Sequence, residues 1–204
     1  MQIDIYSILV IVIAYLIGNI SPSIILGKIH GIDIKKEGSG NAGTTNALRV
    51  LGKKAALITL VIDIGKGILA VRLGMLCGFM IGGLCALAVF CGHIWPCFYR
   101  FKGGKGVATA FGAILAIDWK LALIMLAVAA AGLLLSKRMS VGSLLAAVSF
   151  PLLCWFIKPD FLVVGSIMAL IIIIKHRANI QRLIRGEEPP MGIFKSKDEK
   201  NKEK

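Results

Sequence analysis

Apolar stretches long enough to cross a lipid bilayer recur along most of this chain of 204 residues. Hydrophobic residues make up 57% of the sequence and charged residues only 17%, and the mean hydropathy is +0.82. Soluble domains carry charges on about a quarter of their residues, and a transmembrane helix needs about 20 apolar residues. The sequence therefore predicts an all-α integral membrane protein.

About seven transmembrane helices are predicted from the apolar stretches. They cover residues 6–26, 55–71, 73–95, 107–136 (two helices), 139–157 and 161–174. Small and polar residues at 18–23 predict close packing or a kink near the end of the first span. The stretch 107–136 is interrupted at 118–120, so it fits either one over-long helix or two helices around a tight turn. We favour two, the first unusually short.

The distribution of Lys and Arg predicts an N-terminus outside and a C-terminus in the cytoplasm. With two helices in 107–136, all but four of the 24 Lys and Arg residues fall in segments on one side of the membrane. Cytoplasmic loops collect such residues. Arg72, Lys120 and Lys158 fall on the other side, and Lys66 lies within a span. A single helix in 107–136 would instead place the basic C-terminal segment outside.

The chain is expected to form one transmembrane domain, residues 1–186, followed by a tail. Residues 187–204 are poor in hydrophobic residues and rich in Lys, which predicts a basic, disordered cytoplasmic tail. A net charge of +13 could indicate binding to nucleic acid. However, the charged residues lie between apolar segments, and no nucleic-acid-binding motif accompanies them. We therefore expect lipid headgroups, and not nucleic acid, to be the counterions.

No metal site is expected from the five cysteines. Their number is odd and their spacing is not that of a metal site, which indicates free, packed thiols.

The polar stretch 38–49 has the composition of an anion-binding loop at a membrane surface. Glycines at 38, 40 and 43 allow positive φ, so that successive backbone N–H groups can point at one phosphate. Thr44 or Thr45 can cap a short helix whose N-terminus faces the same point, and Arg49 lies on the face of Thr45. Gly52 can end that helix.

Three further polar segments fall on the same side of the membrane: 101–106, 140–143 and 176–182. Each alone fits a role in topology or headgroup contact. Together they favour one composite site, because Ser, Asn, Thr and Gly accompany the cations. His176 and Asn179 lie one helical turn apart, which fits either function or helix-end capping.

Two features within the spans have structural interpretations. Asp63 and Lys66 are neighbours on a helix face, and we favour a buried structural pair over a proton relay. His93 is expected to be a structural histidine.

The runs GSGNAGTTNALRVLGKK, FKGGKGVATAFG and KHRANIQRLIRGEE, in this order, resemble the bacterial membrane glycerol-3-phosphate acyltransferases that use acyl phosphate as donor. The resemblance covers nearly the whole chain. It implies transfer of an acyl group from acyl phosphate to sn-glycerol 3-phosphate, giving lysophosphatidic acid and inorganic phosphate, the first acylation of phospholipid synthesis.

The resemblance also implies the setting of the reaction. The protein would be a multi-pass protein of the bacterial inner membrane, with its active site facing the cytoplasm. It would act without a cofactor, among membrane lipids, on acyl phosphate from a partner acyl-phosphate synthase.

The family's motifs place roles on particular residues of this chain. The implied catalytic residues are Ser39, Arg49, Lys105, His176 and Asn179. The implied substrate- and phosphate-binding residues are Gly38, Gly40, Asn41, Gly43, Thr45, Gly103, Gly104 and Ser143.

The sequence lacks a common acyltransferase pair, a His with an Asp five positions later. Lys35, Phe98 and Gln181 stand five residues after the three histidines. We therefore expect direct transfer without an acyl-enzyme, with a substrate phosphate oxygen taking the hydroxyl proton. The alternative class is a transporter of a phosphorylated or other anionic small molecule, which predicts binding groups near the bilayer midplane and detectable repeats.

Overall fold

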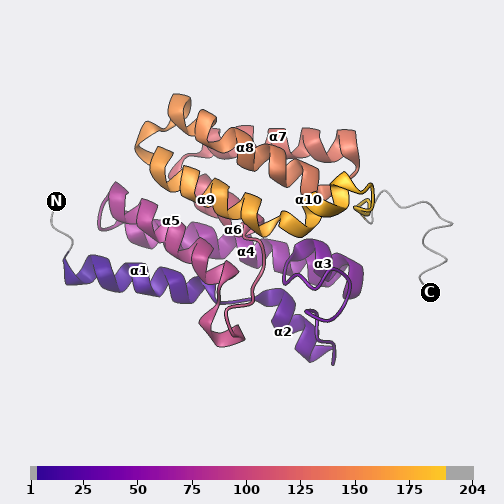
Figure 1. Ribbon diagram of the computed structural model, residues 1–204. Coiled ribbons are helices and arrows are strands. Elements are labelled where there is room, and N and C mark those ends of the chain that lie inside the picture. Colours follow the sequence, from indigo (N-terminus) through magenta and orange to yellow (C-terminus); the bar gives the residue numbers. More distant parts are fainter. Residues whose placement is uncertain (1–3, 192–204) are drawn as a thin grey trace.

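The computed structural model describes residues 4–191, and all regular structure in that range is helical (Figure 1). The helices are α1 (Ile5–Gly18), α2 (Pro22–Ile29), α3 (Thr44–Val50), α4 (Gly52–Met75), α5 (Phe79–Ile94), η1 (Cys97–Tyr99), α6 (Val107–Ile117), α7 (Trp119–Ser136), α8 (Met139–Ile157), η2 (Pro159–Phe161), α9 (Leu162–Lys175) and α10 (Arg177–Ile184).

The long helices run side by side as one bundle (Figure 1). Helix α4 packs on α1, α5 and α6, and α8 packs on α7 and α9. The fully buried Phe90, Phe150 and Phe161 lie in the main core. Glycines allow the closest crossings, since a Cβ on Gly18 would lie 2.9 Å from the Cα of Gly92. Small residues at helix crossings are typical of membrane bundles.

The first apolar stretch is broken at residues 19–21, which confirms the predicted kink. The ammonium of Lys66 on α4 donates hydrogen bonds to the carbonyl oxygens of Gly18, at 3.2 Å, and Ile20, at 2.7 Å. Carbonyls at the end of a helix lack partners within it. Lys66 therefore stabilises the break.

The stretch 107–136 forms two helices, as predicted. Helix α6 has 11 residues and α7 has 18. Asp118 between them is extended and its carboxylate accepts the backbone N–H of Leu121 at 2.9 Å. An Asp at this position stabilises a helix start, so the turn is fixed by local sequence.

Lys66, Asp63 and His93 form a closed polar cluster inside the bundle. Lys66 Nζ lies 2.7 Å from a carboxylate oxygen of Asp63 and 2.8 Å from Nδ1 of His93. All three side chains are buried. The predicted buried pair is confirmed, and His93 belongs to it.

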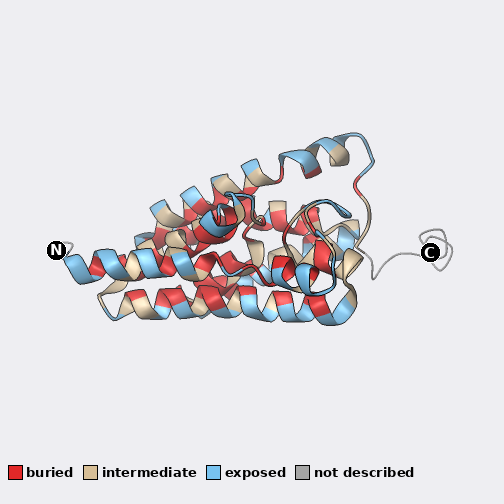
Figure 2. Ribbon diagram, turned by 90° about the horizontal axis from the view of Figure 1, so that it is seen from below, coloured by how far each residue is buried: buried red, intermediate tan, exposed pale blue. Residues whose placement is uncertain are grey.

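Within residues 4–191, four helical segments are long and apolar enough to cross a membrane: Ile5–Ile29, Phe79–Tyr99, Trp119–Ser136 and Met139–Ile157. A fifth is the pair Pro159–Lys175 and Arg177–Ile184, bent by 54°. Helix α6 is shorter, and α4 carries several charges. Exposed faces line the outside of the bundle (Figure 2), and many exposed side chains are large and apolar. The structure is thus that of a multi-pass membrane protein.

Candidate active site

The loop at residues 38–43, before α3, contains three glycines, two of which have positive φ. Gly38 and Gly40 have φ of 60° and 67°, as the sequence predicts, but Gly43 is extended, with φ −148°. Gly43 caps α3 without a side-chain hydrogen bond, so the predicted cap by Thr44 or Thr45 is wrong. Both threonines lie within the helix, which ends at Val50 before Gly52, at φ 85°.

The conformation of this loop depends on Asn46 of α3. Its side-chain amide donates to the carbonyl oxygens of Ile34 and Glu37, both at 3.0 Å, and accepts the backbone N–H of Ser39 at 2.8 Å. Asn46 is fully buried. A buried amide with three backbone partners fixes the chain that surrounds it.

The loop before α6 lies directly against the end of α5. The backbone N–H groups of Gly103 and Gly104 donate to the carbonyl oxygens of Ile94, at 3.1 Å, and His93, at 3.2 Å. A Cβ on Gly104 would collide with the His93 imidazole and lie 2.7 Å from the carbonyl oxygen of Ala42. The absence of a side chain at Gly104 therefore brings the two glycine loops together.

Lys105 joins this loop to the C-terminal motif. Its ammonium donates a hydrogen bond to the side-chain oxygen of Asn179 on α10. The amide nitrogen of Asn179 then donates to a carboxylate oxygen of Glu188 at 2.7 Å. The polar segments 101–106 and 176–182 thus meet through side chains.

Glu188 is the centre of a buried hydrogen-bond network. Its carboxylate also accepts from the hydroxyl of Ser140 and from Nε of Arg182, both at 2.7 Å. Burial alone would raise the pKa of Glu188, but these hydrogen bonds from Asn179, Ser140 and Arg182 lower it. Glu188 is 5% exposed and ionised.

Residues 187–191 pack against the helices, although the sequence analysis predicts that a disordered tail begins at residue 187. Glu188 is buried, its carbonyl oxygen accepts from Nε of Arg138 at 2.8 Å, and the N–H of Met191 donates to the carbonyl oxygen of Lys137 at 2.8 Å. The composition of 187–204 is basic overall, but Glu188 within it forms hydrogen bonds to side chains on α8 and α10. Residues 192–204 lie outside the described range.

His176, between α9 and α10, is held as a neutral ring. Its Nδ1 lies 2.8 Å from the carbonyl oxygen of Ile172. A carbonyl only accepts, so Nδ1 carries the hydrogen and Nε2 is left as the acceptor. Burial, and then the charge of Lys105, lower the pKa of His176 to about 4.

The charges of three other cations act on Lys105. Burial lowers its pKa to about 8; the charge of Glu188 opposes this shift, and the charges of Arg182, Arg49 and Lys175 add to it. Several cations near one carboxylate favour an incoming anion. The arrangement can therefore bind a phosphate.

The structure brings together part of the predicted set. Lys105, His176 and Asn179 adjoin, with the charge of Arg49 acting on Lys105. Ser143 is buried on α8, and its hydroxyl donates to the carbonyl oxygen of Met139 at 3.0 Å. In the described part of the chain, no hydrogen bond joins the exposed Ser39 to this cluster. The other predicted residues lie before α3 (Gly38, Gly40, Asn41, Gly43), on α3 (Thr45) and before α6 (Gly103, Gly104).

Sequence reasoning missed two residues that organise the site. Glu188 falls in the predicted tail, although an acidic pair after a basic helix is a local signal. Asn46 lies within the first motif and Ser140 within the segment 140–143, but neither residue is among the predicted site residues.

Comparisons with known proteins agree on one family. The profile of the family described as "Glycerol-3-phosphate acyltransferase" matches residues 8–186. The chain is 43% identical over 199 residues to the glycerol-3-phosphate acyltransferase of Cronobacter sakazakii, covering 95% of this chain and 96% of the relative. It is 44% identical over 199 residues to that of Shigella flexneri, with the same coverage of both chains.

Solved structures have the same fold. The glycerol 3-phosphate form of PlsY (YgiH), an integral membrane glycerol 3-phosphate acyltransferase, superposes with a TM-score of 0.88 at 32% identity, covering 93% of this chain and 99% of that one. The lysophosphatidic acid form gives a TM-score of 0.84 at 33% identity, covering 91% and 95%. The chain therefore belongs to the glycerol-3-phosphate acyltransferase family.

Proposed function

We propose that this protein transfers an acyl group from an acyl phosphate to sn-glycerol 3-phosphate, giving lysophosphatidic acid and inorganic phosphate. Family membership supports the acylation of glycerol 3-phosphate. The observation that carries the proposal is the hydrogen bond from Lys105 to Asn179, which joins two motif segments within a group of cations. This is a place where a phosphate can bind.

The topology in this proposal has seven spans, with the N-terminus outside, the C-terminus in the cytoplasm and the active site facing the cytoplasm of a bacterial cell. The distribution of Lys and Arg supports it. Helix α4 fits as a span although it carries charges, because Asp63 and Lys66 face each other within the bundle. Helix α6, at 11 residues, is the short span.

Both substrates carry phosphates, so the proposed site holds two anions. Lys105 and Arg49 bind phosphate through charge, and Arg49 can do so with two parallel hydrogen bonds. The loop before α3 forms one side of this proposed site. It contributes the backbone around Gly38 and Gly40, where φ is positive, and the exposed side chain of Ser39. Ser143 lies on the α8 side.

The proposed chemistry is direct acyl transfer. An acyl phosphate is an activated anhydride, so the protein needs mainly to position the glycerol hydroxyl and stabilise charge. The hydroxyl oxygen bonds to the acyl carbon, the bond from that carbon to the phosphate oxygen breaks, and phosphate leaves with the electron pair. A substrate phosphate oxygen takes the hydroxyl proton.

His176 orients the hydroxyl in this scheme. Its Nε2 is an acceptor, because Nδ1–H is committed to the carbonyl of Ile172. With its pKa lowered to about 4 by burial, the ring is neutral near pH 7 but too weak a base to keep the proton. This division of roles agrees with the missing Asp partner.

The test is acylation by purified protein in detergent. Labelled glycerol 3-phosphate is supplied with palmitoyl phosphate, and in parallel with palmitoyl-CoA. We expect lysophosphatidic acid from the acyl phosphate alone, without an acyl-phosphate synthase, which enters only as the supplier of donor. If lysophosphatidic acid formed with palmitoyl-CoA but not with palmitoyl phosphate, the proposed acyl phosphate donor would be wrong. Uptake of unmodified glycerol 3-phosphate into sealed vesicles, with no lysolipid formed, would instead support a transporter.

A further inference from the structure

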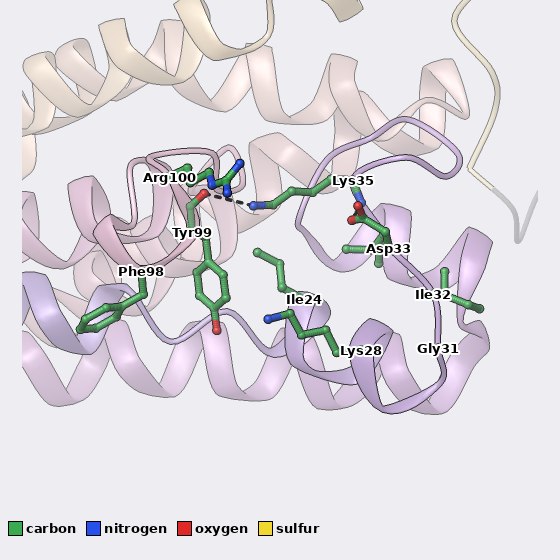
Figure 3. Close-up of a pocket in the computed structure, with 10 residues that line it drawn as sticks. Ile24, Lys28, Gly31, Ile32, Asp33, Lys35, Phe98, Tyr99 and Arg100 are labelled. Carbon is green, nitrogen blue, oxygen red and sulfur yellow. Dashed lines mark hydrogen bonds between the residues drawn. The ribbon is translucent and has the colours of Figure 1, made fainter.

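A cavity of about 610 Å³ opens beside α2, lined by residues outside the predicted catalytic and binding set (Figure 3). Its lining residues come from α2, from residues 31–35 after α2, and from η1 and the following Arg100. The cavity adjoins the first glycine loop, because the side-chain amide of Asn46 donates to the carbonyl oxygen of Ile34, which lines the cavity.

Three cations line this cavity: Lys28, Lys35 and Arg100. Its one lining carboxylate is Asp33, whose oxygen accepts the backbone N–H of Lys35 at 3.1 Å. Between residues 4 and 191, no carboxylate forms an ion pair with any of the three cations. The cavity thus has an excess of positive charge.

The two lysines are arranged around Tyr99, as Figure 3 shows. Their ammonium groups lie 5.7 Å (Lys28) and 5.4 Å (Lys35) from the centre of the Tyr99 ring, and Lys35 also donates to the Tyr99 carbonyl oxygen at 3.3 Å. Contacts with an aromatic face hold an ammonium in place without using its hydrogens. Donors therefore remain for an anion.

Burial lowers the pKa of Lys35, and the charges of Lys102 and Lys28 add to the effect, while Asp33 opposes it. A phosphate in the cavity would relieve this repulsion. The charges around Lys35 therefore favour the binding of an anion in the cavity.

The surroundings of the cavity are those of a membrane interface. Trp95, Phe98, Tyr99 and Phe101 fall within seven consecutive positions, and Phe98 is 71% exposed and lines the cavity. Buried Ile34 contributes to its apolar wall. Aromatic residues collect at the level of lipid headgroups. An amphiphilic ligand fits these surroundings better than a free ion.

We propose that this cavity binds the phosphate of an anionic phospholipid headgroup, with Lys28, Lys35 and Arg100 around the phosphate and Phe98 beside the acyl chains. The site does not take part in acyl transfer. It holds the end of α2 against the membrane surface.

The test measures lipid binding to purified protein in neutral detergent by native mass spectrometry. The probes are dioleoyl phosphatidylglycerol, dioleoyl phosphatidylcholine and inorganic phosphate. The variant is Lys28→Gln/Arg100→Gln, and the control is Lys53→Gln/Lys54→Gln, which removes the same charge from exposed positions on α4. Arg100→Gln alone, at an exposed side chain, provides a second variant if the double variant folds poorly.

We expect wild type and control to bind phosphatidylglycerol more tightly than phosphatidylcholine. The double variant should lose roughly tenfold or more in affinity for phosphatidylglycerol and the single variant several-fold, since each cation contributes to headgroup binding. Thermal unfolding and acylation of glycerol 3-phosphate should be unchanged. Equal affinity in variant and control would overturn the proposal. If millimolar inorganic phosphate displaced phosphatidylglycerol, the proposal of a phospholipid ligand would be wrong, and the cavity would be a binding site for free anions.

Discussion

Lys105 and Asn179 lie 74 positions apart in the sequence, yet the ammonium of Lys105 donates a hydrogen bond to the side-chain oxygen of Asn179. The first residue belongs to the glycine loop before α6 and the second to α10. Their contact continues through Asn179 to Glu188 and from there to Ser140 on α8. Three distant segments therefore depend on one another for their geometry.

The protonation of Lys105 is expected to limit activity at alkaline pH. Its pKa is lowered by burial to about 8, and only the protonated amine attracts a phosphate. The value of kcat/KM for glycerol 3-phosphate should therefore fall as pH rises through about 8. A bound phosphate stabilises the charged form, so kcat should fall at a higher pH.

Lys105→Arg tests this assignment, because arginine stays charged throughout the range. Its remaining activity should lack the alkaline fall. The control is Lys53→Arg at an exposed position, which should keep the wild-type profile. An unchanged alkaline fall in Lys105→Arg would assign the titration to another group.

Glu188→Gln is expected to lower both stability and activity. The substitution removes the charge that pairs with Arg182 and weakens the acceptor for Asn179 and Ser140. The free energy of unfolding should fall by about 1–3 kcal/mol. Thermal unfolding and acylation rates measure the two effects. Glu187→Gln is the matched control, since the Glu187 side chain is exposed; similar losses in both variants would argue against the network.

Gly104→Ala should impair catalysis by displacing the loop that carries Lys105. The new Cβ would collide with the His93 imidazole and approach the carbonyl oxygen of Ala42 at 2.7 Å. A displacement of about 1 Å at a reacting site can cost about 100-fold in rate. Kinetic assays with glycerol 3-phosphate measure the loss.

Gly65→Ala on α4 is the control for this substitution. No atom beyond the neighbouring backbone of its own helix lies within 4 Å of a Cβ built there, so the variant should retain activity. It should gain roughly 0.5–1 kcal/mol in stability, as glycine is unfavourable within a helix. Equal activity of the two variants would mean that the tight fit at Gly104 has no functional consequence.

Asn46 is expected to hold the first glycine loop in place. Asn46→Ala removes all three of its hydrogen bonds, whereas Asn46→Asp keeps an acceptor for Ser39 but puts a carboxylate against two carbonyl oxygens. Each variant should lose roughly 2 kcal/mol or more. Hydrogen exchange of the Ser39 amide should also be faster in Asn46→Ala. Wild-type stability of Asn46→Asp would show that the donated bonds contribute little.

Much of the fold follows from short-range sequence patterns. The interruption at 118–120 and the distribution of Lys and Arg were enough to predict two helices in 107–136. The structure adds the local cause, since the Asp118 carboxylate caps the start of α7. The kink at 19–21 was visible as small and polar residues. In contrast, the partner of Lys66 at that break comes from another helix, and no local pattern reveals it.

The candidate site was predictable in composition but not in connectivity. Small polar residues, glycines and cations marked the four polar segments, and Lys105, His176 and Asn179 do adjoin. Glu188 was lost among lysines, because composition averaged over a segment hides one buried carboxylate whose donors come from 140, 179 and 182. Gly43 was expected to take positive φ, but its place as the residue before α3 requires an extended backbone.

The central claim is that the segments containing Lys105 and Asn179 form one site for acylating glycerol 3-phosphate. A double-mutant cycle tests it most directly, with Lys105→Met, Asn179→Ala and the double variant assayed for lysophosphatidic acid from glycerol 3-phosphate and palmitoyl phosphate. Each single variant should lose much of the wild-type kcat/KM, and the double variant should be little slower than the slower single one, because residues acting as a unit are not additive. Losses that multiply, or single variants with wild-type rates, would contradict the account.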